Sequence, residues 1–113
     1  QGNFICATTD TPYFQLGESK YGKPILDRAL HYSMPLDDAL RCTLISFDST
    51  LRSNVSVGLP LDVLVYHKDS FKIPEGKRIR EDDPYFTQIS KQWSETLRRG
   101  LQELPKPTAD YGL

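Results

Sequence analysis

An α+β fold in which helices cover an antiparallel sheet is predicted by three features of this sequence. Short runs with the composition of strands open the chain, two segments with helical spacing follow, and a further pair of strands precedes a last helical segment. The length of 113 residues fits a single domain. We therefore expect one folded unit and not two cores joined by a linker.

The first two strands are expected close to the start of the chain. A Gly-Asn pair is typical of a tight turn, and the apolar run after it predicts a strand over residues 2–7. Further turn-forming residues follow, and residues 13–16 predict a second short strand that ends at Gly17. Because nothing before the first strand can pair with it, its neighbour in the sheet is expected upstream of Gln1.

Two helices are expected next. Apolar residues between positions 19 and 30 have helical spacing, and a helix is predicted to begin near Pro24. A longer helix over residues 35–52 is predicted by Ser33 as the N-cap, by Pro35 at its start and by two aspartates in its first turn. Its apolar residues recur at intervals of three or four and predict one buried face, made of Leu36, Leu40, Leu44, Phe47 and Leu51.

A β-hairpin is expected after the second helix. Residues 61–66 are apolar on both faces except at Asp62, which is typical of a central strand. Residues 67–70 are polar and predict a reversal of the chain. Residues 71–79 are expected to return as an antiparallel edge strand, in which Pro74 and several charges oppose aggregation. Because both faces of the first strand are apolar, a second layer is expected on its far side.

The last helix is predicted over residues 83–104. An Asp-Pro pair begins it, and Pro105 follows its end. Gly100 is expected to permit a close packing contact, since a glycine within a helix otherwise only weakens it. Residues 1–104 are expected to form the domain and residues 105–113 a flexible tail. The apolar stripe of this helix is the strongest periodic signal in the chain: Phe86, Ile89, Trp93, Leu97, Leu101 and Leu104.

The charge balance excludes some classes of partner. Fourteen Lys and Arg residues stand against 15 Asp and Glu, and the net charge of -1 gives no long-range attraction to nucleic acid or to an anionic membrane. The longest nearly apolar run, residues 55–66, is too short to cross a bilayer. Two cysteines do not make the dense disulfide framework of small secreted domains, so we expect a cytoplasmic protein. No targeting signal is visible, and Gln1 as the first residue indicates a processed or truncated chain.

Few residues of the chain are suited to hold a metal ion. Cys6 and Cys42 lie far apart in the sequence, and the chain has only 2 histidines. We expect two reduced, buried thiols, with a disulfide between them as the less favoured alternative. No metal and no other cofactor is expected.

Two segments have residue types that catalysis or phosphate binding could use. His67 could act as a general base for Ser70, with Asp62 or Asp69 to orient it. A hairpin tip is exposed and forms no pocket, so a solvated histidine is the favoured interpretation there and at His31. Residues 72–83 alternate basic and acidic side chains, which is typical of a solvated surface or a subunit contact and not of a phosphate or calcium site.

Two further segments carry groups suited to a site. Residues 17–23 join a strand to a helix, where backbone N–H groups can bind an anion or a developing oxyanion. Residues 48–58 are dense in hydroxyl groups just before the expected central strand. Caps and turns use the same residue types, so the residues alone leave the function undecided.

Several segments, taken in the same order, resemble one known family. They are residues 2–5, 10–18, 20–25, 48–54 and 59–62, with the sequences GNFI, DTPYFQLGE, KYGKPI, DSTLRSN and LPLD. These segments resemble the bacterial proteasome-type proteins called Anbu, the proposed ancestral beta subunit. The resemblance covers nearly all of this chain but only the C-terminal half of that family's subunit.

The resemblance implies an N-terminal nucleophile hydrolase fold, a four-layer αββα sandwich with two antiparallel sheets between two helical layers. It would explain the unpaired first strand and the doubly apolar one. In proteasome subunits the nucleophile is the hydroxyl of an N-terminal threonine, whose amino group can act as base with help from a lysine and an aspartate. These groups are expected in the half of the subunit outside this sequence. Since Gln1 has no nucleophilic hydroxyl, this chain alone is expected to be inactive.

The resemblance also implies supporting residues. Comparison with proteasome beta subunits puts Glu18 or Ser19 where a Gly-Ser-Gly turn places a serine near the threonine amine. It puts Ser56 at the position of a supporting serine. Ser53 stands in place of a supporting aspartate and departs from the family's pattern, because a serine lacks the negative charge that stabilises a nearby ammonium group.

The function implied by the resemblance is that of a self-compartmentalising threonine peptidase. Such a protein would assemble into a ring or spiral homo-oligomer and cleave peptides or unfolded proteins. The alternative is a non-catalytic or weakly catalytic assembly subunit, which the serine at position 53 favours. A third hypothesis is an independent binding domain. It requires the chain to fold alone as a monomer, whereas we expect it to associate or aggregate because one face of its sheet would be uncovered.

Overall fold

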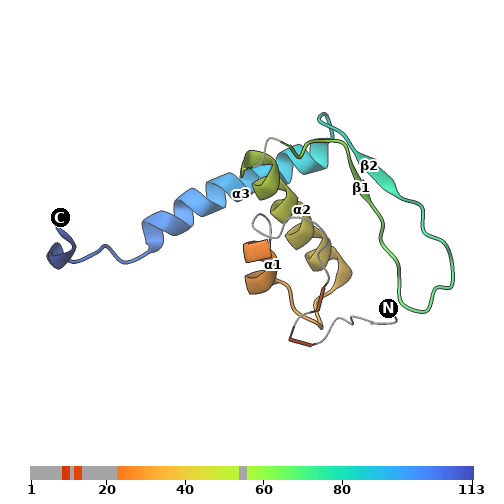
Figure 1. Cartoon of the computed structure of the whole chain (residues 1–113), viewed down its shortest axis with the longest axis horizontal. Coiled ribbons are helices and arrows are strands. Elements are labelled where there is room, and N and C mark those ends of the chain that lie inside the picture. Colours follow the sequence, from red (N-terminus) through yellow and green to blue (C-terminus); the bar gives the residue numbers. More distant parts are fainter. Residues whose placement is uncertain (1–8, 11, 14–22, 54–55) are drawn as a thin grey trace.

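The computed structural model describes residues 9–10, 12–13, 23–53 and 56–113. In these residues the protein is mostly helical with one small antiparallel sheet (Figure 1). The predicted strand at residues 2–7 lies outside them, as do residues 14–16. Tyr13 is described and is not in a strand. The elements are α1 (Lys23–Ala29), α2 (Leu36–Ser53), β1 (Leu61–Val63), β2 (Lys77–Ile79), α3 (Pro84–Glu103) and the short 3₁₀ helix η1 (Ala109–Tyr111).

The first two helices form where the sequence predicts them. Helix α1 begins one residue before Pro24, and α2 begins one residue after Pro35 with two aspartates in its first turn. The prediction of Ser33 as the N-cap of α2 is wrong. The carbonyl of Pro35 accepts the first helical bond, from the Ala39 amide at 3.0 Å, and the Ser33 hydroxyl lies 3.4 Å from the ring of His31.

Helix α2 is buried on more than the single face that its apolar stripe predicts. Leu44 is 1% exposed, but Leu36 and Phe47 of the same stripe are exposed. The reason is that α2 packs against α1 as well as α3. Contacts on two sides bury positions that lie off the stripe, namely Cys42, Ser46 and Asp48.

The predicted hairpin is confirmed, with shorter strands than expected. Strands β1 and β2 pair antiparallel, with Leu61 opposite Ile79 and Asp62 opposite Arg78. The ladder ends at Val63, and the Ser70 amide bonds the carbonyl of His67 at 3.2 Å in the reversal. Between the strands the chain follows a wide loop (Figure 1). The expected strands over 61–66 and 71–79 are therefore wrong in extent. The large apolar side chains of the loop are exposed: Leu64, Tyr66, Phe71 and Ile73.

The hydrophobic core lies where α2, α3 and the hairpin meet. Its buried members are Leu44, Leu61, Ile79 and Phe86, so each of the four elements contributes one side chain. Half-buried apolar residues surround them: Leu40, Leu51, Leu59, Val63 and Ile89. Helices therefore cover one face of the hairpin, as the order of elements predicts.

Helix α3 begins at the predicted cap and then leaves the rest of the chain. The Asp83 carboxylate accepts a hydrogen bond from the Phe86 amide at 2.9 Å, and Pro84 occupies the first helical position. The second half of α3 projects away from the other helices, and the chain measures 58 Å along its longest axis (Figure 1). A Cβ added at Gly100 would meet nothing within 4 Å, so the described residues do not make the close contact predicted there.

The two remaining predictions concern membrane crossing and the C-terminal tail. The described residues include no helix with both the length and the hydropathy needed to cross a bilayer. In the predicted tail, η1 forms one short turn, and the Gly112 amide bonds the carbonyl of Ala109 at 3.0 Å. The flexibility of residues 105–113 stays a prediction.

Candidate functional site

The described site residues lie at the C-terminal end of α2. Ser53 is the last residue of the helix, Ser56 follows three positions later, and both are exposed. Glu18 and Ser19, the other two predicted site residues, lie outside the described residues. The structure therefore places two of the four residues at one helix end and leaves their proximity to the other two as a prediction.

A buried carboxylate lies one turn before these serines. The Asp48 side chain is 8% exposed, and its Oδ1 atom accepts a hydrogen bond from the Ser90 hydroxyl of α3 at 2.5 Å. Its Oδ2 atom lies 3.4 Å from Nε of Arg52, which follows it by one helical turn. The carboxylate thus connects the last turns of α2 to α3.

Arg52 completes a closed network of three side chains. Its Nη2 atom donates to the Ser90 hydroxyl at 3.3 Å, so Ser90 donates to the carboxylate and accepts from the guanidinium. Arg52 and Ser90 also line an open groove of about 510 Å³ along α3, together with Glu95 and Arg98. We call Asp48, Arg52 and Ser90 the α2–α3 clasp.

The clasp is suited to hold geometry and not to activate a nucleophile. Both carboxylate oxygens of Asp48 are engaged, Oδ1 by the Ser90 hydroxyl and Oδ2 by Nε of Arg52. Ser90 therefore has a bridging role between two helices, in which both of its hydrogen-bonding functions are used.

Asp48 lies in the hydroxyl-rich segment of the sequence but has no predicted role there, and Ser90 belongs to no motif. The partners are 42 positions apart, so no local motif links them. One local signal is present, because Arg52 follows Asp48 at the i,i+4 spacing at which opposite charges meet on a helix. That spacing predicts the ion pair but not the burial of the Asp48 carboxylate or its contact with α3.

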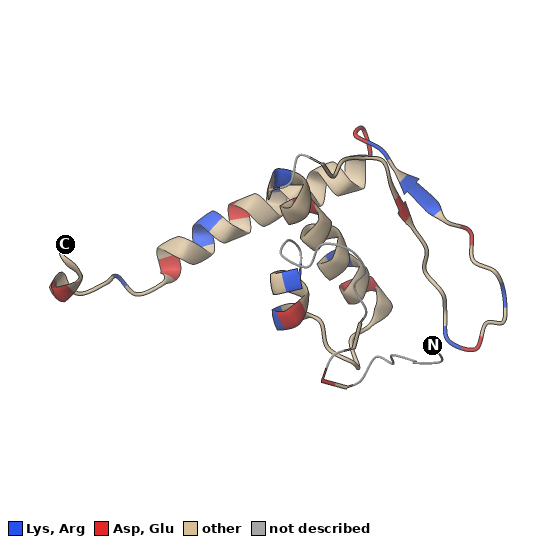
Figure 2. Cartoon of the chain, viewed as in Figure 1, with Lys and Arg blue, Asp and Glu red and all other residues tan. Residues whose placement is uncertain are grey.

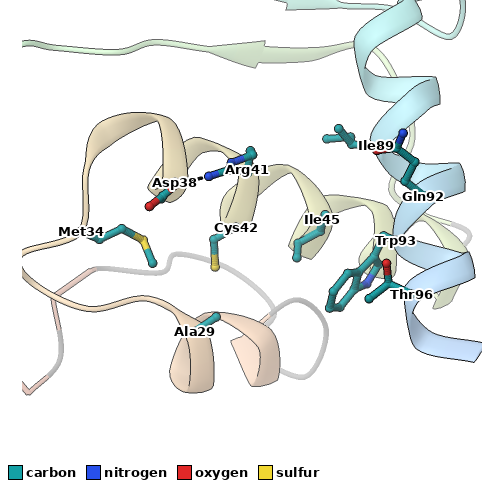
Figure 3. A pocket seen from close by; sticks show the side chains of 10 residues that line it. All are labelled: Ala29, Met34, Asp38, Arg41, Cys42, Ile45, Ile89, Gln92, Trp93 and Thr96. Carbon is teal, nitrogen blue, oxygen red and sulfur yellow. Dashed lines mark hydrogen bonds and ion pairs between the residues drawn. The ribbon is translucent and has the colours of Figure 1, made fainter. Parts of the chain in front are cut away.

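An apolar pocket of about 420 Å³ lies between α1, α2 and α3. Figure 3 shows Ile45 of α2 next to Trp93 of α3 in its wall, with Cys42 further along α2. The indole Nε1 of Trp93 is buried and has no hydrogen-bond partner among the described residues. Cys42 is a buried free thiol, as predicted, and burial raises its pKa above the ordinary value of 9.0. A thiol that stays protonated at neutral pH is a poor nucleophile.

The histidines lie as the favoured interpretation predicts. Both His31 and His67 are exposed, and the Ser70 amide closes the turn that contains His67. No group of three or more His, Cys, Asp or Glu side chains that could hold a metal ion occurs in the described part of the chain.

The alternating charges of residues 72–83 are partly engaged in ion pairs. Nε of Arg78 lies 2.8 Å from the Asp62 carboxylate across the hairpin, and Nζ of Lys77 lies 3.5 Å from that of Asp83. The hydrogen bond from Arg78 lowers the pKa of Asp62, and that from the Phe86 amide lowers the pKa of Asp83. Acidic and basic side chains are interspersed along the hairpin and α3 (Figure 2), and this pattern supports the interpretation as a solvated surface.

Comparison with known proteins identifies relatives of the whole chain. No family model and no curated protein matches it. Among solved structures, it is 64% identical to a chain of the helical assembly of the Anbu complex from Pseudomonas aeruginosa, with a TM-score of 0.91. It is 62% identical to Anbu, the ancestral beta-subunit, from Yersinia bercovieri, with a TM-score of 0.88. Its identity to Anbu from Hyphomicrobium sp. strain MC1 is 52%, with a TM-score of 0.86.

These matches cover nearly all of this chain but only part of each relative. They span 97%, 96% and 93% of the chain, and 46%, 46% and 45% of the respective relatives. The fold described above is therefore that of one part of a longer subunit in each solved structure. By sequence and by fold, the chain belongs to the Anbu family of proteasome beta-like proteins, as a homologue of somewhat less than half of the Anbu subunit.

Proposed function

We propose that this chain is the C-terminal half of a proteasome-type threonine peptidase subunit. The subunit is an N-terminal nucleophile hydrolase with the four-layer αββα sandwich, and it works in the cytoplasm on peptides or unfolded proteins. The observation that carries the proposal is the identity of 52% to 64% with Anbu structures over nearly the whole chain. At such identity the fold is shared, and the peptidase activity is what we propose in addition.

In this proposal the attacking hydroxyl belongs to the half of the subunit that precedes these residues. Ser53, Ser56 and one of Glu18 and Ser19 support the N-terminal threonine and its amino group. The exposure of Ser53 and Ser56 in the described residues fits this role, since a supporting residue has to face a neighbouring part of the site.

The uncovered surfaces of the chain support an incomplete sandwich. The loop between β1 and β2 exposes large apolar side chains, and Ile73 is 96% exposed. Exposed apolar side chains grouped together mark surfaces that a partner or another part of the protein covers. A second half with its own sheet provides such a cover for the hairpin.

Self-association is the second part of the proposal. A relative with 64% identity is a chain of a helical assembly. The projecting half of α3 supports the same behaviour here, because it exposes Leu97 and Leu101 of the apolar stripe, and Leu104 directly after the helix is exposed as well. A neighbouring subunit that covers this stripe removes apolar surface from water, which is the main driving force for association.

The decisive experiment uses the full-length protein that contains this sequence. The coding sequence upstream of Gln1 should place threonine, serine or cysteine directly after the initiator methionine. The purified protein should hydrolyse peptide substrates, and replacement of that first residue by alanine should abolish the hydrolysis. A start without a hydroxyl or thiol residue would contradict the peptidase assignment.

A non-catalytic assembly subunit is the second candidate, and the residue at position 53 favours it. The resemblance to proteasome subunits puts Ser53 in place of the supporting aspartate, and a serine cannot stabilise an ammonium group by charge. In that case the full-length protein should assemble and hydrolyse no peptide. The substitution Ser53→Asp separates the candidates, because it should raise peptidase activity if the missing charge limits catalysis.

A further inference from the structure

A charged side chain buried between two helices is unexpected on grounds of stability alone. Asp48 is among the most buried residues of the described chain. Removing a carboxylate from water is costly, and an apolar residue of similar size often gives equal or greater stability in its place. The Asp48 side chain is 8% exposed, whereas that of its partner Arg52 is 61% exposed. The buried carboxylate is therefore better explained by the geometry that it imposes than by the stability that it adds.

The α2–α3 clasp imposes a definite geometry, because each of its groups is used. Both oxygens of Asp48 are occupied, one by the Ser90 hydroxyl and one by Arg52. The Ser90 hydroxyl donates once and accepts once. The bond from the Ser90 hydroxyl to the carboxylate is short, at 2.5 Å, as is typical of hydrogen bonds to charged groups. A rotation or shift of α2 against α3 by part of a turn would break both bonds to Ser90 together.

The clasp acts at the end of α2, where a helix is otherwise least rigid. The last carbonyl groups of a helix have no partner within it, and helix ends open at low energetic cost. Arg52 immediately precedes Ser53, so its two contacts hold the final turn from which Ser53 and Ser56 extend. The apolar contacts between α2 and the core are made by Leu40, Leu44 and Leu51. Since Leu51 belongs to the last turn, the clasp adds polar contacts to α3 at a turn that the core also holds.

We propose that Asp48, Arg52 and Ser90 are positioning residues that fix the end of α2 on α3 and so orient Ser53 and Ser56 for their supporting role. This inference rests on the proposed function for the role of these two serines. The positional effect itself does not depend on that function and can be measured separately.

Hydrogen exchange in the full-length protein tests the positional effect. The substitution Ser90→Ala removes the bridge from a half-buried site without introducing bulk. It should increase amide exchange at residues 53–58 about tenfold, the factor expected for one hydrogen bond to a charged group. Exchange in β1 should remain unchanged. Ser90→Thr, which keeps the hydroxyl, should restore the exchange rates to within about twofold of the wild type.

The matched control is Ser46→Ala in the same helix. The Ser46 hydroxyl is buried and bonds the Cys42 carbonyl of its own helix at 3.0 Å. Its loss removes a buried serine hydroxyl without breaking a bond to α3, so exchange at residues 53–58 should not change. Equal acceleration in the two alanine variants, or acceleration spread over the whole protein by Ser90→Ala, would overturn the proposal.

Kinetics test the functional part. If the full-length protein is a peptidase, Ser90→Ala should lower kcat about tenfold and leave KM unchanged, and Ser90→Thr should restore kcat. An unchanged kcat despite faster local exchange would refute the positioning role. If the wild type hydrolyses no peptide, the proposed function fails, while the exchange data still decide whether the clasp holds the segment.

A double-mutant cycle tests whether the clasp acts as one unit. Asp48→Asn keeps the shape of the side chain and removes the charge that binds Arg52. Its effect on local exchange and that of Ser90→Ala should be strongly non-additive, because either change breaks the same network. Additive effects would show that the two residues act independently and would overturn the proposed unit.

Discussion

The two halves of α3 have the same apolar periodicity and opposite surroundings. In the first half, Phe86 is buried in the core and Ile89 packs against it. In the second half, Leu101 is 69% exposed, and the helix projects beyond the other elements (Figure 1). An amphipathic stripe therefore indicates that a helix face is covered. It does not indicate which part of the chain, or which partner, covers that face.

The contrast has a physical cause in the size of the described core. The helix has 20 residues and at 1.5 Å per residue is about 30 Å long. The hairpin and α2 contribute few buried side chains, and the core residues of α3, Phe86 and Ile89, lie in its first two turns. The remaining stripe needs a cover from outside the described residues, and in the proposed function a neighbouring subunit provides it.

The largest expected effect follows from the first half of α3. Phe86→Ala in the full-length protein should lower the free energy of unfolding by about 3–5 kcal/mol, because it leaves a cavity among core residues. Chemical denaturation of the dissociated subunit measures this change. A loss below about 1 kcal/mol would mean that the core is arranged differently from the cluster described here.

A substitution in the second half of α3 should weaken self-association and leave the stability of the single subunit nearly unchanged. Leu101→Ala should weaken self-association at least tenfold, measured by sedimentation velocity, since burial of a leucine contributes about 1.5–3 kcal/mol. Unfolding of the dissociated subunit should change by less than about 0.5 kcal/mol. Gln102→Ala, at the adjacent exposed position, is the control and should affect neither. A clear loss of subunit stability instead would assign the cover to the same subunit.

A substitution at Gly100, also in the second half of α3, should have a smaller effect. An added Cβ meets open space in the described chain, so Gly100→Ala should stabilise the dissociated subunit by about 1 kcal/mol through helix propensity. If a neighbouring helix packs closely there, as the sequence predicts, the same change should weaken assembly. Stabilisation without any effect on assembly would place Gly100 outside the interface.

The sequence predicts the helices of this protein better than its strands. The start of α3 follows from an adjacent pair, Asp83 and Pro84, and such capping signals act within one turn. The extent of a strand depends on its neighbours in the sheet. Residues 61–66 have the pattern of a central strand, but only β2 pairs with them in the described part of the chain, and the ladder stops at Val63.

The candidate site could be predicted only in part for a related reason. Ser53 and Ser56 follow from a resemblance of contiguous segments. The contact between Asp48 and Ser90 joins two helices through packing that no local pattern encodes, because helix positions far apart in sequence meet only in the fold. The exposed face of α2 is another such case, since contact with α1 decides which side of the helix is buried.

The smallest expected effect concerns the N-cap that anchors the packed half of α3. The Phe86 amide and Lys77 lower the pKa of the Asp83 carboxyl below its ordinary value of 3.8. A carboxyl with a lowered pKa stabilises the folded state at pH values above its unfolded pKa, and this contribution is lost as the pH falls through the folded value. Asn caps helices about as well as Asp but does not titrate.

Asp83→Asn should therefore match the wild type closely near pH 7 and lose less stability on acidification below about pH 4. Thermal unfolding from pH 7 to pH 2 measures the difference between the two proteins, in which the other aspartates cancel. Parallel curves would show that the cap carries no charge-dependent stability, and the first half of α3 would then owe its order to apolar packing alone.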